Sequence, residues 1–571
     1  MPHHRPRDAA ARKCHHREGR LAGALLGLVV AVFSLDVAAE NATDRIVEAT
    51  LERHIAALSA DEFAGRFPGS PAEKLTLDYL RAGFAKAGAQ PGNGESYLQE
   101  VPLLNWTLDP EPSFVVTGPG FSRALDYRVE MVAATRRSAA RISIEDSPLV
   151  FAGYGIVAPE YGWNDYAGMD VRGKTVVVLV NDPGFATGEP GLFTGRAMTY
   201  YGRWTYKFEE AARQGAAAVL VVHETEPASY GWAVVAQGAG ESLGLPGQDA
   251  ATVPEAEGWL SAAAAESLFA AAGEDFHALK NAASRAGFRA RPLGALTADI
   301  EIHSRMREFS SSNVVAILPG SKRPDEYVLF TAHWDHLGVE GEEIFNGAVD
   351  NASGTAGLLV LAEAYAQLDP PPERTLVFLA VTAEEQGLLG SAHYGAHPVF
   401  PLARTAAVIN IDGLNYIGPT RDISVIGYGA SELDELVDRV AAAHRRRVLP
   451  DPRPEAGSYY RSDHFNLAKR GVPALYPKMG HDLVDGGMEK GRALAQRFVE
   501  ERYHKPADEY HSGQDWRGAV ADLRLYFDIG LAIANTGAWP NWVEGNEFRA
   551  IRDAQRPAEG PAQDPYEEVP K

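Results

Sequence analysis

The chain has 571 residues, of which 45% are hydrophobic and 23% are charged, and it carries a formal net charge of −22. This length is enough for two or three globular domains, each with its own core. The acidic balance argues against a nucleic-acid partner, because a polyanion would be repelled.

The N-terminal residues are typical of a secretory signal peptide. Residues 1–20 are rich in Lys and Arg, and they precede the apolar run LAGALLGLVVAVFSL and small residues that end at Ala39. The run is shorter than the roughly 20 residues that a membrane span needs. We therefore expect cleavage after Ala39, a secreted or periplasmic protein and no stable membrane association.

Removal of residues 1–39 changes the net charge from −22 to −25 and takes away Cys14, the single cysteine of the chain. Without a thiol the mature protein has no disulfide, no cysteine nucleophile and no thiolate metal site. Any metal must then be bound by histidine and carboxylate side chains.

Residues 40–147 are expected to form the N-terminal part of the same domain as residues 301–548. Apolar residues recur at helical spacing from 46 to 58 and from 71 to 88, and the loop FAGRFPGS separates these two helices. Short strands are expected between 95 and 145.

Residues 148–300 have a different character. The runs KTVVVLVNDP and AAAVLVVHE are predicted strands, and WTYKFEEAARQGA between them is a predicted helix. The segments DYAGMDVRGKTVVVLV and KFEEAARQGAAAVLVV together resemble the protease-associated domain, a small β-rich insert of several peptidase families. We expect such an insert here.

Residues 301–548 alternate short apolar strands with helices. Examples are YVLFTAH, TAGLLVLAEAYAQL, RTLVFLAVT and TAAVINID. This alternation predicts an α/β sandwich with a mostly parallel central sheet, in which ligands bind at the carboxyl ends of the strands. Residues 549–571 are rich in proline and charge and are expected to be a disordered tail.

Potential metal ligands follow each of these strands. They are His333, Asp350, Glu384, Glu385 and Asp412. A single histidine or aspartate at a strand end is usually a cap or a loop residue. Several carboxylates at one sheet edge would repel one another unless a cation lies among them, so the set predicts one or two divalent metals.

Five ordered motifs resemble the secreted co-catalytic dizinc aminopeptidases, a family related to glutamate carboxypeptidase and transferrin receptor. The motifs are AHWDH at 332–336, NGAVDNASG at 346–354, TAEEQGLLGS at 382–391, NID at 410–412 and RYHKPADEY at 502–510. The resemblance covers about 45–140 and 305–545. It implies the three-layer α/β/α sandwich fold of the zinc exopeptidases. It also implies that the protein hydrolyses peptides.

The resemblance also implies a set of metal ligands and a general base. One zinc ion would be bound by His333 and Asp412 and a second by Glu385 and His504, with Asp350 bridging the two; Glu384 would be the general base. Both glutamates can face the site only if the chain turns there, because successive strand side chains point in opposite directions. Asp335 would orient the imidazole of His333, and His336 is interpreted as an ordinary loop residue.

Further implications concern the surrounding loops. The resemblance implies a cis peptide bond between Asp350 and Asn351. Tyr503 is the candidate for stabilising the oxyanion, in competition with Tyr459 and Tyr460. Ser462, Asp463 and His464 are adjacent in sequence and cannot form a catalytic relay, so they are expected to line the pocket.

Three alternatives remain open. Gly240–Gly244 fits the nucleophile-elbow pattern of serine hydrolases, although the required strand and helix are not evident. A non-catalytic binding protein of the same fold would be expected to lack ligands that are present here. A carboxypeptidase, unlike the favoured aminopeptidase, needs a cation for the terminal carboxylate, and Arg461, next to Tyr460, is the candidate.

The short segment after His504 favours a monomer.

Overall fold

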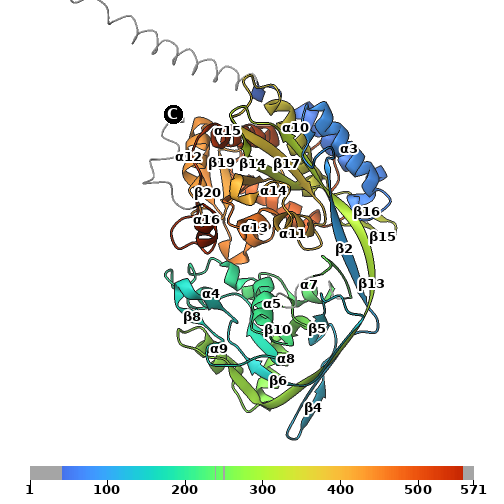
Figure 1. Cartoon of the computed structure of the whole chain (residues 1–571), viewed down its shortest axis with the longest axis vertical. Helices are drawn as coiled ribbons and strands as arrows, with labels where there is room; N and C mark the ends of the chain where they lie inside the picture. The colour runs from blue at the N-terminus through green and yellow to red at the C-terminus, as the bar shows by residue number, and fades with distance from the viewer. Residues whose placement is uncertain (1–41, 238–239, 248–250, 252, 557–571) are drawn as a thin grey trace, which may run out of the picture.

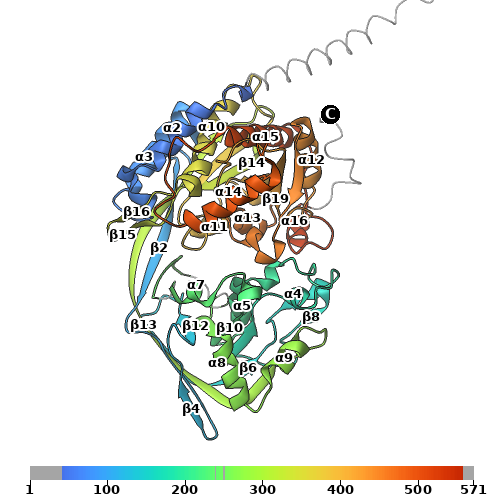
Figure 2. The same ribbon diagram turned by 180° about the vertical axis from the view of Figure 1, so that it is seen from behind.

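The computed structural model describes residues 42–237, 240–247, 251 and 253–556. The expected signal peptide and Cys14 lie outside these ranges. Two lobes lie one above the other in Figures 1 and 2, and strand β13 (Arg291–Leu318) runs along both. Among the described helices, none combines the length and apolar character that a membrane crossing requires.

The upper lobe contains a mixed sheet whose central strands are parallel. β14 (Arg323–His333) pairs in parallel with β17 (Arg374–Val381) on one side and β18 (Thr405–Asn410) on the other, and β18 pairs in parallel with β21 (Ala474–Met479). Antiparallel strands extend both sides: β13 and β2 (Leu98–Leu108) beyond β17, and β19 (Asp422–Ile426) beyond β21. The predicted α/β fold with a mostly parallel centre is therefore confirmed.

Helices cover both faces of this sheet, because alternate residues of each strand point to opposite sides. Val328 and Phe330 of β14 pack in one apolar cluster, and Leu329 packs in another. The first cluster includes residues from α2 (Glu48–Leu58), α3 (Glu73–Lys86), α10 (Gly354–Tyr365), α12 (Leu433–Ala443) and α15 (Arg517–Asn535). The second includes residues from α11 (Leu389–Ala396) and α13 (His464–Ala468).

Two predicted helices are found close to their expected positions, as α2 and α3. The expected disorder from residue 549 is wrong for the first residues, because Arg549–Gln555 forms helix α16. Arg552 of this helix is 2% exposed, and its guanidinium donates to the main-chain oxygen of Thr405 at 3.1 Å. This anchor explains why a charged and proline-rich stretch begins as ordered helix. Residues 557–571 lie outside the described part.

The lower lobe is built on a second sheet. β10 (Ala218–His223) pairs in parallel with β9 (Thr175–Leu179) and β12 (Ala256–Ser261), and β6 (Arg141–Phe151) pairs with β9 and with the first half of β13. The same sheet includes β3 (Ser113–Gly118), β4 (Phe121–Ala124) and β5 (Met131–Ala134). It therefore begins well before residue 148, where the insert was expected to start.

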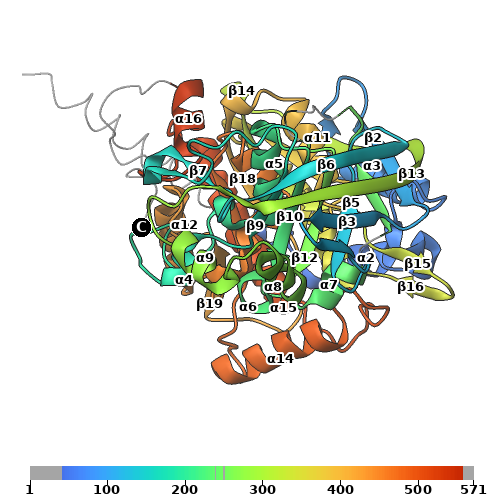
Figure 3. The same ribbon diagram turned by 90° about the horizontal axis from the view of Figure 1, so that it is seen from below.

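The helices of the lower lobe lie beside its sheet. The predicted helix between the two strands is α5 (Trp204–Arg213). The others are α4 (Pro183–Thr187), α6 (Thr225–Ala228), α7 (Trp232–Gln237), α8 (Ala262–Ala271) and α9 (Phe276–Ala283). In the upper lobe, α14 (Gly487–Glu501) lies at the margin of the molecule, as Figure 3 shows, and Gly491 is its one buried residue.

Candidate metal centre

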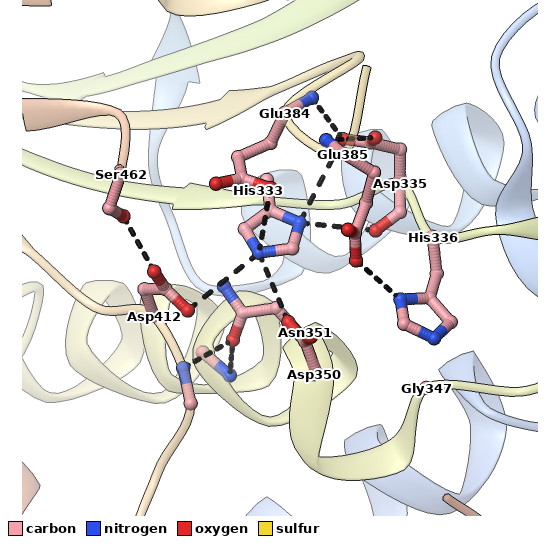
Figure 4. Close-up of polar contacts among 12 residues, drawn as sticks. His333, Asp335, His336, Gly347, Asp350, Asn351, Glu384, Glu385, Asp412 and Ser462 are labelled. Carbon is pink, nitrogen blue, oxygen red and sulfur yellow. Dashed lines mark hydrogen bonds and ion pairs between the residues drawn. The ribbon is translucent and has the colours of Figure 1, made fainter. Parts of the chain in front are cut away.

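Histidine and carboxylate side chains from separate segments meet at the carboxyl edge of the parallel strands (Figure 4). His333 ends β14, Glu384 and Glu385 follow β17, and Asp412 follows β18. Asp350 lies in η4 (Ala348–Ser353), directly before α10. Parallel strands place their carboxyl ends at one edge, so the common location follows from the topology.

His333 lies at the centre of the cluster and is fully buried. Its Nε2 atom is 3.4 Å from Oδ1 of Asp350, 3.9 Å from Oδ1 of Asp412 and 3.9 Å from Oε2 of Glu384. No protein atom forms a hydrogen bond with this nitrogen among the described residues. Three carboxylates therefore surround an imidazole nitrogen that has no direct partner.

Asp350 faces both histidines, one with each carboxylate oxygen. Its Oδ1 is directed to His333, and its Oδ2 lies 3.2 Å from Nε2 of His504. The peptide bond between Asp350 and Asn351 is cis, which confirms the expectation. The main-chain N–H groups of Val349 and Asp350 donate to the buried carboxylate of Asp508, at 3.1 and 3.0 Å to Oδ2. Asp508 therefore holds the loop that carries Asp350.

A turn brings Glu384 and Glu385 to the same site. Ala383 has φ of +52°, and the N–H groups of Gly387 and Leu388 donate to the main-chain oxygen of Glu384 at 2.9 and 2.8 Å. The chain therefore leaves the extended conformation of β17. The sequence predicts such a turn, because Glu384 and Glu385 could not otherwise both face the site.

Asp335 supports this turn rather than the imidazole of His333. Its carboxylate accepts from the main-chain N–H of Glu384 at 3.1 Å and of Glu385 at 3.3 Å. Nδ1 of His333 is 3.1 Å from the main-chain oxygen of Asp335 but 3.9 Å from its carboxylate. The expected role is thus corrected: the backbone of Asp335 orients the histidine, and its side chain fixes both glutamates.

His504 reaches the cluster from a distant segment, after α14. Its Nε2 is 3.1 Å from Oε2 of Glu385, and its side chain is 38% exposed. The ring of Tyr503 stacks on it, with centroids 3.9 Å apart. Tyr503 is 44% exposed, so the aromatic residue that stacks on His504 is partly accessible to solvent. All residues of the predicted ligand set therefore lie together.

Three residues contact Asp412; Tyr476 and Lys478 were missed by the sequence reasoning, whereas Ser462 was expected to line the pocket. The hydroxyl groups of Ser462 and Tyr476 donate to Oδ2 of Asp412 at 2.6 and 2.7 Å. Nζ of Lys478 lies 3.3 Å from Oδ1 and also contacts the main-chain oxygen of Asp412. Ser462 lies in the loop before α13, and Tyr476 and Lys478 lie in β21, so local sequence gives no signal for these contacts.

Arg66 was also missed. It lies in the loop FAGRFPGS, is 1% exposed, and donates to the main-chain oxygens of Leu58, Trp334, Asn346 and Gly347. Two of these acceptors flank the cluster in sequence, next to His333 and before η4. Arg66 therefore ties the N-terminal helices to the loops that carry the site.

The charged groups of the cluster shift one another's pKa values. Burial lowers the pKa of His504, but the neighbouring carboxylates of Asp350 and Glu385 outweigh it and raise the pKa to about 10. The pKa of His333 is likewise held well above its usual value, despite burial, by Glu384, Asp350 and Asp412. Burial, with nearby carboxylates, raises the pKa of Glu384 well above its ordinary value. The cluster attracts positive charge.

The residues fit a divalent metal by their donor chemistry. Three groups present ligand atoms that all lie within 4.8 Å of one another: His333 with Glu384 and Glu385, His333 with Asp350 and Asp412, and His336 with Asp350 and Glu385. Imidazole nitrogen and carboxylate oxygen are the ligands that zinc takes in the absence of thiolate. Buried polar atoms normally have a partner, and a bound metal ion would supply one for the unpartnered Nε2 of His333.

The interpretation of His336 as an ordinary loop residue is wrong. Its side chain is fully buried, and its Nδ1 lies 2.7 Å from Oε1 of Glu385. The contact between His336 and Glu385 has no signal in the sequence, because the two residues are brought together only by folding.

Other sequence patterns are not catalytic in the structure. Ser462, Asp463 and His464 contact Asp412, Ser391 and Asn410 respectively, so they form no relay. Ser242 lies inside β11 (Glu241–Gly244), paired with β2, and the described residues 245–247 that follow are not helical. The elbow geometry of a serine hydrolase is therefore absent there.

The lower lobe contacts the loop that precedes α13 and Lys469, the residue that follows this helix. The main-chain N–H of Met198 donates to the oxygen of Pro454 at 3.1 Å, and Lys469 forms an ion pair with Glu209 at 3.1 Å. Tyr460 of this loop is half-buried, and its hydroxyl group lies 3.3 Å from Glu547. The loop that supplies Ser462 to Asp412 thus also forms the contact between the lobes.

Two arginines meet at this contact. The guanidinium of Arg461 lies over the ring of Tyr230, 5.6 Å from its centroid. Arg203 is 8% exposed, and its Nε has no hydrogen-bond partner. Burial and the charge of Arg461 lower the pKa of Arg203 to about 10. No ion pair with a carboxylate is found for either arginine within the described residues.

Comparison with known proteins gives a family match in the upper lobe. Residues 313–525 match Peptidase family M28. A mouse protein, Aminopeptidase NAALADL1, is 36% identical over 118 residues, which are 20% of this chain and 15% of the mouse protein. A Probable zinc metalloprotease of Pyricularia oryzae is 44% identical over 267 residues, covering 42% of this chain and 51% of that protein.

Among solved structures, an aminopeptidase from Aneurinibacillus sp. strain AM-1 aligns over 87% of this chain and 96% of its own, with a TM-score of 0.48 and 20% identity. The curated relatives are matched over about half of their length or less.

Proposed function

We propose that this chain is a dizinc exopeptidase and, of the two exopeptidase classes, an aminopeptidase that acts on short peptides. Its residues 313–525 match Peptidase family M28. The family match and the relatives support a zinc metallopeptidase of the hydrolase class. One observation carries the proposal: His333, Asp350, Glu385, Asp412 and His504 converge on one sheet edge with a buried imidazole nitrogen that lacks a partner.

The geometry supports two metal positions that share Asp350. His333 and Asp412 would hold one zinc ion, and Glu385 and His504 the other. The two oxygens of Asp350 face different histidines, at 3.4 and 3.2 Å, as a bridging carboxylate would. Bound zinc supplies a Lewis acid that polarises the scissile carbonyl and lowers the pKa of water.

Glu384 would move the protons. Its carboxylate lies 3.9 Å from Nε2 of His333, and its main chain is fixed by Asp335. Because burial raises its pKa, the carboxylate is suited to accept a proton from the attacking water and to transfer it to the leaving amine. Tyr503, stacked on His504, would donate to the oxygen of the scissile carbonyl. The hydroxyl group of Tyr476 is already engaged by Asp412.

A carboxypeptidase is the second candidate, and the arginine pair favours it. Arg461 directly precedes Ser462, which contacts Asp412, and Arg203 of the lower lobe lies nearby without an acidic partner. Two guanidinium groups at the contact between the lobes could bind the terminal carboxylate of a peptide.

Substrates with one free end separate the two candidates. An aminopeptidase hydrolyses leucine p-nitroanilide and leaves N-acetylated dipeptides intact, whereas a carboxypeptidase does the opposite. Activity on either should disappear with 1,10-phenanthroline and return with Zn²⁺. If neither class is hydrolysed by the metal-loaded protein, the proposal is wrong.

Variants of the arginines refine this test. For a carboxypeptidase, Arg461→Met and Arg203→Met should raise KM for the free carboxylate substrate by roughly tenfold or more, while the exposed Arg470→Met should not.

Two further parts of the proposal rest on sequence. Export through residues 1–39 would place the protein in the periplasm or outside the cell, probed by N-terminal sequencing of the mature protein. The lower lobe would be a protease-associated domain that borders the site and limits substrates to short peptides. Its contacts with the loop of Tyr460 and Arg461 support this placement. Hydrolysis of long peptides as fast as of dipeptides would contradict it.

A further inference from the structure

His336 lies beside the metal centre but belongs to neither the ligand set nor the acid–base machinery described above. Its side chain is fully buried, and its Nδ1 is 2.7 Å from Oε1 of Glu385. Figure 4 shows the ring beside the carboxylate, on the side away from Asp412. A buried histidine at hydrogen-bond distance from a predicted metal ligand needs a physical explanation.

The direction of the hydrogen bond is fixed by the partners. An ionised carboxylate can only accept, so Nδ1 of His336 must carry the proton and donate it. This donation occupies Oε1 of Glu385. The other oxygen, Oε2, faces Nε2 of His504 at 3.1 Å. The two oxygens of Glu385 therefore have separate partners.

The ring of His336 is also held in place by packing. A Cβ atom built on Gly347 would lie 2.5 Å from both Cγ and Cδ2 of the imidazole, so the glycine backbone lies directly against the ring. The main-chain N–H of His336 donates to the oxygen of Arg66 at 3.4 Å. The ring of His504 is 5.9 Å away and nearly perpendicular. A ring this constrained can orient its partner.

We infer that His336 is a positioning residue for Glu385: its Nδ1–H group holds Oε1 so that Oε2 alone is presented to the metal site shared with His504. This inference rests on the proposed dizinc site and deepens it. The hydrogen bond would keep the carboxylate from rotating or from binding through both oxygens. His336 should thus affect the site of Glu385 and His504, and not the site of His333 and Asp412.

Metal titration tests the inference without reliance on peptidase activity. Metal-free protein is titrated with Co²⁺, and the d–d absorption and the calorimetric isotherm resolve the two sites. For His336→Leu, one site should weaken by roughly 10- to 100-fold and the other should remain unchanged. Equal weakening of both sites, or no weakening, would overturn the inference.

Conservative variants separate positioning from a general loss of structure. The amide nitrogen of asparagine occupies a place close to Nδ1 of histidine, so His336→Asn should restore the weakened site to within a few-fold of wild type. In glutamine the donor is one bond further out, so His336→Gln should remain as weak as His336→Leu. If Asn is as weak as Leu, the hydrogen bond is not the cause.

Two controls complete the design. If His336→Leu does not fold, as judged by the melting curve of the metal-free protein, the comparison of Asn with Gln alone decides. A fall from two bound ions to one in His336→Asn would show that the imidazole is itself a ligand, and would overturn positioning. Failure of the proposed function is seen separately, because wild-type protein would then bind fewer than two ions or hydrolyse no peptide.

Discussion

Asp508→Asn is the substitution that should reveal how the central carboxylate is held. Oδ2 of Asp508 accepts from the main-chain N–H groups of Val349 and Asp350, and the residue is fully buried. Burial, with the nearby charge of Asp350, raises the pKa of Asp508 to about 6, so it is ionised at pH 7.5. Asparagine keeps the shape but removes the charge.

The expected loss follows from the two hydrogen bonds. A hydrogen bond to a charged acceptor contributes about 1.5–3 kcal/mol, and one between neutral groups about 0.5–1.5 kcal/mol. The difference is about 1 kcal/mol for each of two bonds, or about 2 kcal/mol in total. If this energy orders the loop of Asp350 for metal binding, zinc affinity should fall by roughly 30-fold.

Competition of zinc between the protein and a chromophoric chelator at pH 7.5 measures this change. Glu509→Gln is the matched control, because it removes one carboxylate charge from the same loop at an exposed position. It should leave the affinity within about twofold. Unchanged affinity in Asp508→Asn, or equal losses in both variants, would refute the reasoning that Asp508 orders the bridging ligand.

Three further outcomes are expected. Glu384→Gln should lower kcat by roughly 10²- to 10⁴-fold with both zinc ions retained, and loss of metal would contradict its role as base. Zinc should displace a proton from His504, whose pKa is about 10 without metal. Affinity should therefore rise with pH up to that value, and calorimetry in buffers of different ionisation enthalpy should report proton release; absence of release would contradict the pKa. Arg66→Met should lower the free energy of unfolding by about 4 kcal/mol, at about 1 kcal/mol for each of four carbonyls left unpaired. Urea denaturation checks this against exposed Arg81→Met, and a loss below about 1 kcal/mol would contradict it.

Much of the site could be read from the order of strands. His333, Glu385 and Asp412 each follow an apolar run, and parallel strands must end at one edge, so their meeting needed no coordinates. The cis bond after Asp350 and the turn at Glu384 were likewise predictable from the motifs. The strands and the helix expected between residues 148 and 300 are present in the lower lobe. The earlier strands of its sheet were not assigned to it, because short strands with polar turns resemble any connecting segment.

The sequence by itself determined which residues are candidates for the chemistry, because donor type and strand-end position are local properties. Only the tertiary structure decided how those residues are held. Asp335 fixes the two glutamates and not the histidine, Asp508 reaches the loop of Asp350 across 158 positions, and His336 touches Glu385 across 49. Such contacts depend on the directions in which loops leave the sheet, and these directions are set by packing between segments that are remote in the chain.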